Sequence, residues 1–146
     1  MPLSSPAYAL HKLVFDLDRA ADGLLRKRLN IPYKRALFLL VLKHHGTITQ
    51  HELAVALGYS DPAVSGMLIE LEKAGYLTTA PSPQHGRKRL VSITAAGSTL
   101  VKTGKRILDS RFADLLESAG VDGVQYQQMT ERLQQALSIK MKEENS

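Results

Sequence analysis

Apolar residues recur at helical spacing in the first part of the chain. Between residues 7 and 29 they follow steps of three and four, the periodicity of a helix with one buried face. Pro32 ends this helix, because proline disfavours a helical conformation in the residue before it. Residues 33–45 are apolar on nearly every side and predict a buried central helix, which Gly46 terminates. Residues 1–6 are rich in proline and serine and are predicted to form a short arm.

Two short helical patterns then meet at a tight turn. The first covers residues 50–57 and ends at Gly58, and Thr49 with Glu52 has the spacing of a capping box at its start. The second follows the turn at Tyr59-Ser60, has Pro62 at its start and runs to about Ala74. The positions expected to face inward are Leu53, Ala54, Leu57, Val64, Leu68 and Leu71. This arrangement predicts a helix-turn-helix.

A β-hairpin is predicted directly after these helices. Residues 76–80 and 90–94 have the composition of strands, and the segment PSPQHGRKR at 81–89 combines proline, glycine and basic residues as loops do. A hairpin after a helix-turn-helix is typical of a winged helix, here expected over about residues 32–97. The predicted fold class is therefore mainly α with a small β-hairpin wing (α+β).

Long helical patterns return over residues 95–142, in one helix to about Ser118 and another from about Gly123. Together with the helix over 7–29, they offer more apolar surface than a winged-helix core can cover. Two-fold dimerisation through these terminal helices is the favoured interpretation. The alternative is a monomer in which they form an additional all-helical part. The whole chain, 1–146, is expected to be one domain, with a frayed tail at 143–146.

Composition narrows the function classes. The net charge of +5 and the pI of about 9.6 suit a polyanionic partner. The sequence has no cysteine, which excludes disulfides and thiolate metal sites. No apolar run approaches the roughly 18 residues of a membrane span, and the first residues lack the pattern of a signal peptide. We therefore expect a cytoplasmic protein without a membrane partner.

The residue pattern supports neither a catalytic site nor a metal site. His11, His44, His45 and His51 match no zinc-binding spacing, so a pH-sensitive or capping role is favoured for them. No nucleophile triad, paired-carboxylate cleft or phosphate-binding glycine loop can be assembled. We expect no enzymatic activity, no metal site and no cofactor.

The second helix of a helix-turn-helix lies in the major groove of duplex DNA. In residues 61–73 three of the four charged residues are acidic, and none is the Arg, Asn or Gln that reads a base through two hydrogen bonds. Ser65 can form one hydrogen bond to a base, whereas a helix that mainly holds the fold is the alternative. Ser60 or Asp61 is also expected to cap this helix. The predicted contact residues are Ser60, Asp61, Pro62, Ala63, Ser65 and Gly66.

Basic residues gather in the predicted wing. Arg87 is expected at its tip, where an arginine can enter the minor groove, and Lys88 and Arg89 are expected to touch phosphates. A solvated basic turn is the alternative. The predicted wing contacts are His85, Gly86, Arg87, Lys88 and Arg89, and further phosphate candidates are Lys34, Arg35 and Lys43.

An ordered set of residues resembles the MarR family, the multiple-antibiotic-resistance regulators. The set is Glu52-Leu53-Ala54, Leu57-Gly58, Ser60, Val64-Ser65, Leu71-Glu72, Gly75-Tyr76-Leu77, Arg87, Val91, Ile93-Thr94 and Gly97. The resemblance covers nearly the whole chain. It implies a homodimer, joined through the terminal helical regions, that binds a palindromic operator, usually as a repressor. Many members release DNA when a small aromatic ligand binds, so duplex DNA, a second copy and such a ligand are the implied partners.

Two features depart from the family pattern. His85 stands where the wing usually has an acidic residue two positions before its arginine. Gly66 and Glu70 stand where the recognition helix often carries arginine or other polar readers. No motif defines the residues that would bind an effector, and the lack of cysteine rules out the thiol-based peroxide sensing of one branch.

We interpret the chain as a homodimeric DNA-binding transcriptional regulator, a ligand-responsive repressor. A ligand would change the distance between two recognition helices, so that they no longer fit successive major grooves about 34 Å apart. The acidic recognition helix motivates an alternative function, a winged-helix protein-interaction module with weak or lost DNA binding.

Overall fold

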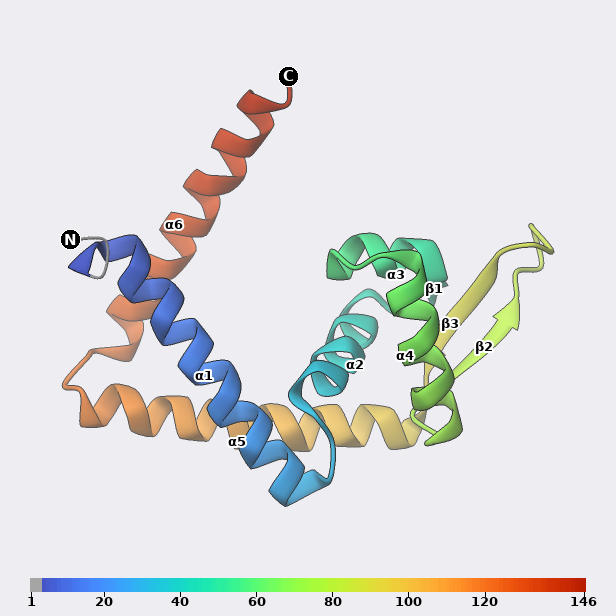
Figure 1. Ribbon diagram of the computed structural model, residues 1–146, viewed down its shortest axis with the longest axis horizontal. Coiled ribbons are helices and arrows are strands. Elements are labelled where there is room, and N and C mark those ends of the chain that lie inside the picture. The colour runs from blue at the N-terminus through green and yellow to red at the C-terminus, as the bar shows by residue number, and fades with distance from the viewer. Residues whose placement is uncertain (1–3) are drawn as a thin grey trace. The chain divides into compact units, whose positions relative to one another are not determined.

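The computed structural model describes residues 4–146 (Figure 1). Residues 1–3, the first half of the predicted arm, lie outside the described residues. The chain forms two compact units, Met1–Lys105 and Arg106–Ser146. Helices dominate and are accompanied by one small antiparallel sheet, so the predicted fold class is confirmed.

The first unit contains the winged helix. Its elements are α1 (Pro6–Leu29), α2 (Tyr33–His45), β1 (Ile48–Thr49), α3 (Gln50–Leu57), α4 (Asp61–Lys73), β2 (Leu77–Pro81), β3 (Arg89–Ile93) and the first part of α5 (Ala95–Ser118). The predicted bounds of these helices are confirmed to within one residue. The first helix begins at Pro6 because the Ser5 hydroxyl oxygen accepts a hydrogen bond from the Tyr8 N–H at 3.1 Å.

The sheet has the strand order β1-β3-β2, with both pairings antiparallel. Leu77 lies opposite Ile93, and Pro81 lies opposite Arg89. Because Pro81 and Arg89 still pair as strand residues, the predicted wing loop over 81–89 is too long by one residue at each end. The connecting loop covers residues 82–88.

At the other end of the hairpin, the predicted strands also differ from the observed ones by one residue. The Tyr76 N–H donates to the Leu71 carbonyl oxygen at 3.0 Å and so closes the end of α4. The Gly97 N–H donates to the Thr94 hydroxyl at 3.1 Å, which makes Thr94 part of the start of α5. A Cβ on Gly97 would overlap the Tyr76 carbonyl oxygen, so glycine allows α5 to pass close to this backbone.

The core of the first unit is built around α2. Phe38, Leu39 and Leu42 are fully buried, which confirms the prediction of a buried central helix. Burial of a Leu or Phe side chain stabilises a fold by about 1.5–3 kcal/mol relative to exposure. The other apolar core residues are Leu25, Ile31, Leu53, Ala54, Val64, Leu68, Leu71, Leu77, Val91 and Val101.

The second unit consists of the remainder of α5 and α6 (Gly123–Glu144). The Asp122 carboxylate caps α6 by accepting from the Gln125 N–H at 2.9 Å. The predicted frayed tail at 143–146 is wrong for its first two residues, which remain helical. No glycine or proline interrupts the sequence there, and the Asn145 N–H still donates to the Met141 carbonyl oxygen at 3.2 Å.

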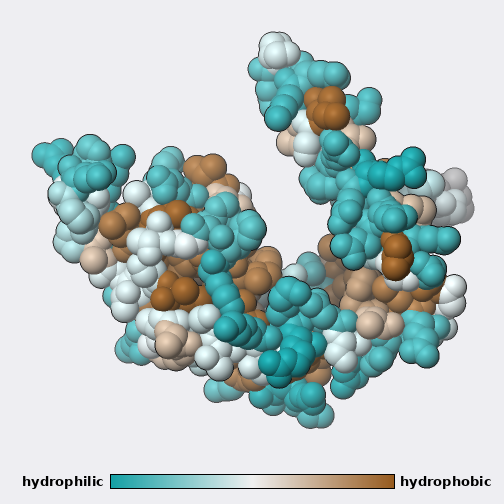
Figure 2. Space-filling model, turned by 180° about the vertical axis from the view of Figure 1, so that it is seen from behind, coloured by the Kyte–Doolittle hydropathy of each residue, from teal (hydrophilic) through white to brown (hydrophobic). Residues whose placement is uncertain are grey.

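Apolar residues remain exposed along α6, where no side chain is buried. Figure 2 shows hydrophobic residues among hydrophilic ones on this part of the surface. The exposed large apolar residues of α6 are Val124, Met129, Leu133, Leu137, Ile139 and Met141. None of the helices described in residues 4–146 combines the length and the apolar character that a membrane crossing requires.

Candidate nucleic-acid interface

The first turn of α4 is open to solvent. Gly58 adopts a left-handed φ of 70° and turns the chain between α3 and α4. Ser60, rather than Asp61, caps α4, since its hydroxyl oxygen accepts from the Ala63 N–H at 3.3 Å. Asp61, Pro62 and Ala63 are exposed. This part of α4 therefore offers the accessible surface that contact with base edges requires.

Ser65 also holds the helix-turn-helix together. The Gln50 side-chain amide on α3 donates to the Ser65 hydroxyl oxygen at 2.6 Å, and Ser65 is half-buried. The hydroxyl retains its own hydrogen for a further acceptor. The sequence did not predict this role of Gln50, because a hydrogen bond between residues fifteen positions apart leaves no local pattern. Gly66 is exposed, and no heavy atom lies within 4 Å of the position a Cβ would take.

Two acidic side chains on the exposed side of α4 have partners on other helices. The Asp61 carboxylate lies 3.3 Å from the Nδ1 atom of His51 on α3. The Glu70 carboxylate pairs with the guanidinium of Arg35 on α2. The Arg35 guanidinium reduces the negative field that α4 would present to a phosphate backbone.

The third acidic side chain of α4, Glu72, bonds to the hairpin. Its Oε1 atom accepts from the Thr79 N–H at 3.0 Å and from the Thr79 hydroxyl at 3.1 Å. The Thr79 hydroxyl oxygen in turn accepts from Arg89 at 2.7 Å. The Arg89 guanidinium is therefore bonded to β2, whereas the sequence predicts Arg89 as a phosphate contact. Sequence reasoning missed Thr79 and the connection it makes between α4, β2 and β3.

A tight turn forms the tip of the wing. The Ser82 N–H donates to the Lys88 carbonyl oxygen at 2.7 Å, and the Lys88 N–H donates to the His85 carbonyl oxygen at 2.9 Å. Gly86 and Arg87 lie inside this second turn, and all residues from His85 to Lys88 are exposed. Within the described residues, no acidic side chain forms an ion pair with Arg87 or Lys88. Their charges are thus available to an anionic partner.

The predicted phosphate candidates on α2 separate into two groups. Lys34 and Arg35, in its first turn, line an open groove of about 420 Å³ together with residues of α4. The α4 residues of this groove are Pro62, Ala63, Gly66, Met67 and Glu70. Lys43 lies in the last turn of α2 and does not line the groove. The structure therefore brings Lys34 and Arg35, but not Lys43, to the exposed face of α4.

The histidines do not assemble into a recognisable metal site. The rings of His44 and His45 meet edge to face with centroids 5.2 Å apart, and His51 lies beside Asp61. Among residues 4–146, no group of three or more His, Cys, Asp or Glu side chains could hold a metal ion. The prediction of a pH-sensitive or capping role for these histidines stays a prediction.

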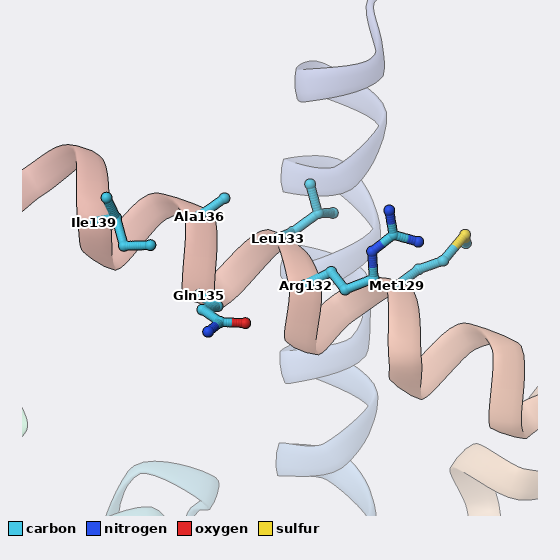
Figure 3. Close-up of a pocket in the computed structure, with 6 residues that line it drawn as sticks. All are labelled: Met129, Arg132, Leu133, Gln135, Ala136 and Ile139. Atoms are coloured by element: carbon cyan, nitrogen blue, oxygen red, sulfur yellow. The ribbon is translucent and has the colours of Figure 1, made fainter.

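A second open groove, of about 640 Å³, follows α6. Figure 3 shows the residues that line it, with Leu133 and Ala136 projecting from one side of α6 and Gln135 from the other. The lining residues are Met129, Arg132, Leu133, Gln135, Ala136 and Ile139. Because every one of them belongs to α6, this groove is an exposed helix surface rather than a ligand chamber.

Comparison with known sequences places the chain near transcriptional regulators. Residues 29–88 match the model of the MarR family. An uncharacterized HTH-type transcriptional regulator of Mycobacterium bovis is 31% identical over 78 residues, which cover 53% of this chain and 54% of that protein. The organic hydroperoxide resistance transcriptional regulator of Bacillus subtilis is 33% identical over 76 residues, 52% of each chain. The chain thus spans about half the length of the curated relatives it matches.

Solved structures share the fold over nearly the whole chain. MepR from Staphylococcus aureus, in a complex with DNA, superposes with a TM-score of 0.74 at 25% identity, covering 92% of this chain and 96% of that one. A cysteine-to-serine mutant of MarR from Escherichia coli, in a complex with operator DNA, gives 0.77 at 21% identity and covers 94% of both chains. The winged-helix fold predicted from the sequence is confirmed.

Proposed function

We propose that this protein, whose residues 29–88 match the model of the MarR family, is a homodimeric DNA-binding transcriptional regulator, a ligand-responsive repressor of a palindromic operator. One observation carries the proposal: the exposed first turn of α4 accompanies a wing whose Arg87 and Lys88 have no acidic partner among the described residues. In helix-turn-helix proteins this turn meets base edges, and basic side chains meet phosphates.

The chemistry of the two elements indicates how recognition is divided. At the start of α4, the cap residue Ser60 together with Ala63 and Ser65 offers hydroxyl and methyl groups but no bidentate base reader. Positive charge is concentrated in the wing, where Arg87 is suited to a narrow minor groove. Minor-groove and phosphate contacts, together with the spacing of two half-sites, therefore contribute more to recognition than base contacts of α4.

Homodimerisation is supported by the apolar surface of the terminal helices, considered unit by unit. In the first unit, α1 exposes Leu10, Leu13, Val14 and Phe15. In the second unit, α6 has no buried side chain and exposes a series of large apolar residues. A two-fold partner would cover these surfaces and place two recognition helices on a palindrome. A small aromatic ligand would act by shifting the population toward a spacing that does not fit the operator.

Footprinting on DNA that flanks the protein's own gene tests the proposal. We expect protection of a palindromic site and an affinity that falls steeply as salt rises, because phosphate contacts release counterions. Scrambled fragments of the same length serve as the control. If no flanking fragment binds better than scrambled duplex, the regulator assignment fails and the alternative, a winged-helix protein-interaction module, gains support.

A further inference from the structure

The ion pair between Glu70 and Arg35 lies at the proposed DNA-binding face. Arg35 comes from the first turn of α2, and Glu70 comes from the exposed side of α4. Their side chains are 39% and 54% exposed, respectively. An ion pair with this much exposure to water contributes little to folding, so its partners can exchange at low cost.

The surroundings of the pair are those of a phosphate contact. Glu70 and Arg35 line the same open groove as Lys34, and Ala63 and Gly66 line its α4 side. Ala63 and Gly66 belong to the proposed DNA-contacting surface, and the space around Gly66 is open. A duplex lying against the first turns of α4 would bring its backbone to this groove. A guanidinium binds phosphate with the same forked geometry that it uses for a carboxylate.

Glu70 differs in this respect from the other acidic residues of α4. Glu72 accepts hydrogen bonds from Thr79, which is neutral, and Asp61 lies beside His51, whose charge depends on its protonation. Glu70 instead holds a group that stays cationic at every physiological pH. Glu70 therefore pairs with the Arg35 guanidinium, which a DNA phosphate could otherwise bind.

We propose that Glu70 is an internal competitor of DNA phosphate for Arg35, and that it selectively weakens binding to duplex of arbitrary sequence. The inference rests on the proposed DNA-binding function and deepens it. When Arg35 leaves Glu70 for a phosphate, the freed carboxylate stands beside the DNA and retains a cation, which offsets the cation released from the duplex. Binding to random DNA consists almost entirely of such phosphate contacts, whereas operator binding also has contacts with bases.

The Glu70→Gln variant tests the proposal directly, because glutamine keeps the size of the side chain and removes its charge. The probe is a random-sequence duplex, and its affinity is measured by fluorescence anisotropy at several salt concentrations. We expect binding about two- to five-fold tighter than that of the unaltered protein, the scale of one exposed ion pair. The slope of log affinity against log salt should steepen by about 0.9 for each regained phosphate contact.

The Arg35→Gln variant and the double variant provide the matched control. If Glu70 competes for Arg35, the gain from Glu70→Gln disappears when Arg35 is already glutamine. A gain that persists in that background reflects the general loss of a negative charge and overturns the proposal. No gain, or weaker binding, for Glu70→Gln also overturns it.

The same titrations separate this inference from the proposed function. Coupling between Glu70 and Arg35 on random duplex, without a preference for any fragment flanking the gene, would sustain the competitor and overturn the operator-specific regulator. A clear operator preference without that coupling would sustain the operator-specific regulator and overturn the competitor. If no variant binds random duplex even at low salt, the competitor is overturned, whereas the regulator fails only if no fragment flanking the gene is bound in preference to scrambled duplex.

Discussion

Thr79 is the residue at which the proposed recognition helix and the wing are joined. Its N–H and hydroxyl both donate to Glu72, and its hydroxyl oxygen accepts from Arg89. Thr79→Val keeps the β-branched shape but removes the hydroxyl. We expect a loss of about 0.5–1.5 kcal/mol in the free energy of unfolding, measured by urea denaturation, since one hydrogen-bonded group is lost and Arg89 loses its partner.

Thr78→Val is the matched control for this substitution. Thr78 is the neighbouring residue of β2 and is exposed, and successive side chains of a strand point to opposite faces. This variant should leave stability within about 0.5 kcal/mol of the unaltered protein. Equal losses at both positions would mean that the Glu72–Thr79–Arg89 connection adds no stability.

We expect Asp22 to make the stability of the fold sensitive to acid. Its carboxylate accepts from the Tyr33 N–H at 2.9 Å and from Arg26 at 2.8 Å, which joins α1 to the start of α2. The Tyr33 N–H, with Arg26 as the second cause, lowers the pKa of this carboxyl below its usual 3.8. A carboxyl with a depressed pKa in the folded state stabilises the fold above its unfolded pKa. That contribution is fully present at neutral pH and is lost as the pH falls below about 4 and through the depressed value.

Asp22→Asn should therefore reduce stability at pH 7 and flatten the loss of stability on acidification. Thermal unfolding followed by circular dichroism between pH 7 and pH 2.5 measures both effects. If the unfolding temperature falls equally steeply with decreasing pH in the variant and in the unaltered protein, the Asp22 carboxylate does not stabilise the contact between α1 and α2.

At the scale of elements, local chemistry determined what the sequence could predict. Caps, proline and glycine act within a few residues, so Ser60, Gly58 and the Thr49–Glu52 capping box were identifiable in advance. The strand bounds at Tyr76 and Thr94 could not be predicted in this way. The Tyr76 N–H donates to Leu71 of α4 and the Thr94 hydroxyl accepts from Gly97 of α5, although the Thr94 N–H still donates to the Tyr76 carbonyl oxygen at 3.1 Å. Such bonds depend on how the elements pack.

The same reasoning applies to the candidate interface. The sequence indicates which residues of α4 and the wing are basic, small or polar, and most of them are exposed as expected. It does not indicate which of them have partners from other elements. Ser65 is bonded to Gln50, and Arg89 is bonded to Thr79, so both have structural roles that the sequence pattern alone conceals.

The wing as an element carries a testable expectation. Arg87 lies in the terminal turn and is exposed. Arg87→Ala should weaken binding to duplex DNA and lower the salt slope by about one per contact, if the side chain meets the DNA backbone or minor groove. Lys140→Ala, which removes one positive charge from α6, is the control and should change binding far less. Equal effects of the two substitutions in anisotropy titrations would contradict the wing assignment.

At the scale of the whole molecule, the surplus of apolar surface bears on the oligomeric state. Each unit retains large exposed apolar side chains on helices that have a polar side as well. Contiguous apolar patches larger than a few hundred Å² are uncommon on monomeric soluble proteins and indicate sites of association. The periodic apolar stripes in the sequence predict this surface. Its geometry in an assembly could not be predicted, because it depends on a second chain.

Leu133 on α6 offers the sharpest test of that association. It is 67% exposed in the single chain and projects from the side of α6 opposite to Gln135 (Figure 3). If a partner covers Leu133, Leu133→Glu would bury an unpaired charge, which costs about 3 kcal/mol and raises the dimer dissociation constant roughly 100-fold. Sedimentation equilibrium should then detect monomers, and binding to a palindromic duplex should weaken because the two half-sites are no longer read together.

Gln135→Glu introduces the same charge on the opposite side of that helix and should leave the dimer largely intact. If Leu133→Glu and Gln135→Glu sediment alike, this side of α6 lies outside the interface. A monomeric unaltered protein that still protects a full palindrome would exclude homodimerisation in solution as the origin of two-fold recognition. Assembly would then have to occur on the DNA, where binding would show a sigmoidal dependence on protein concentration.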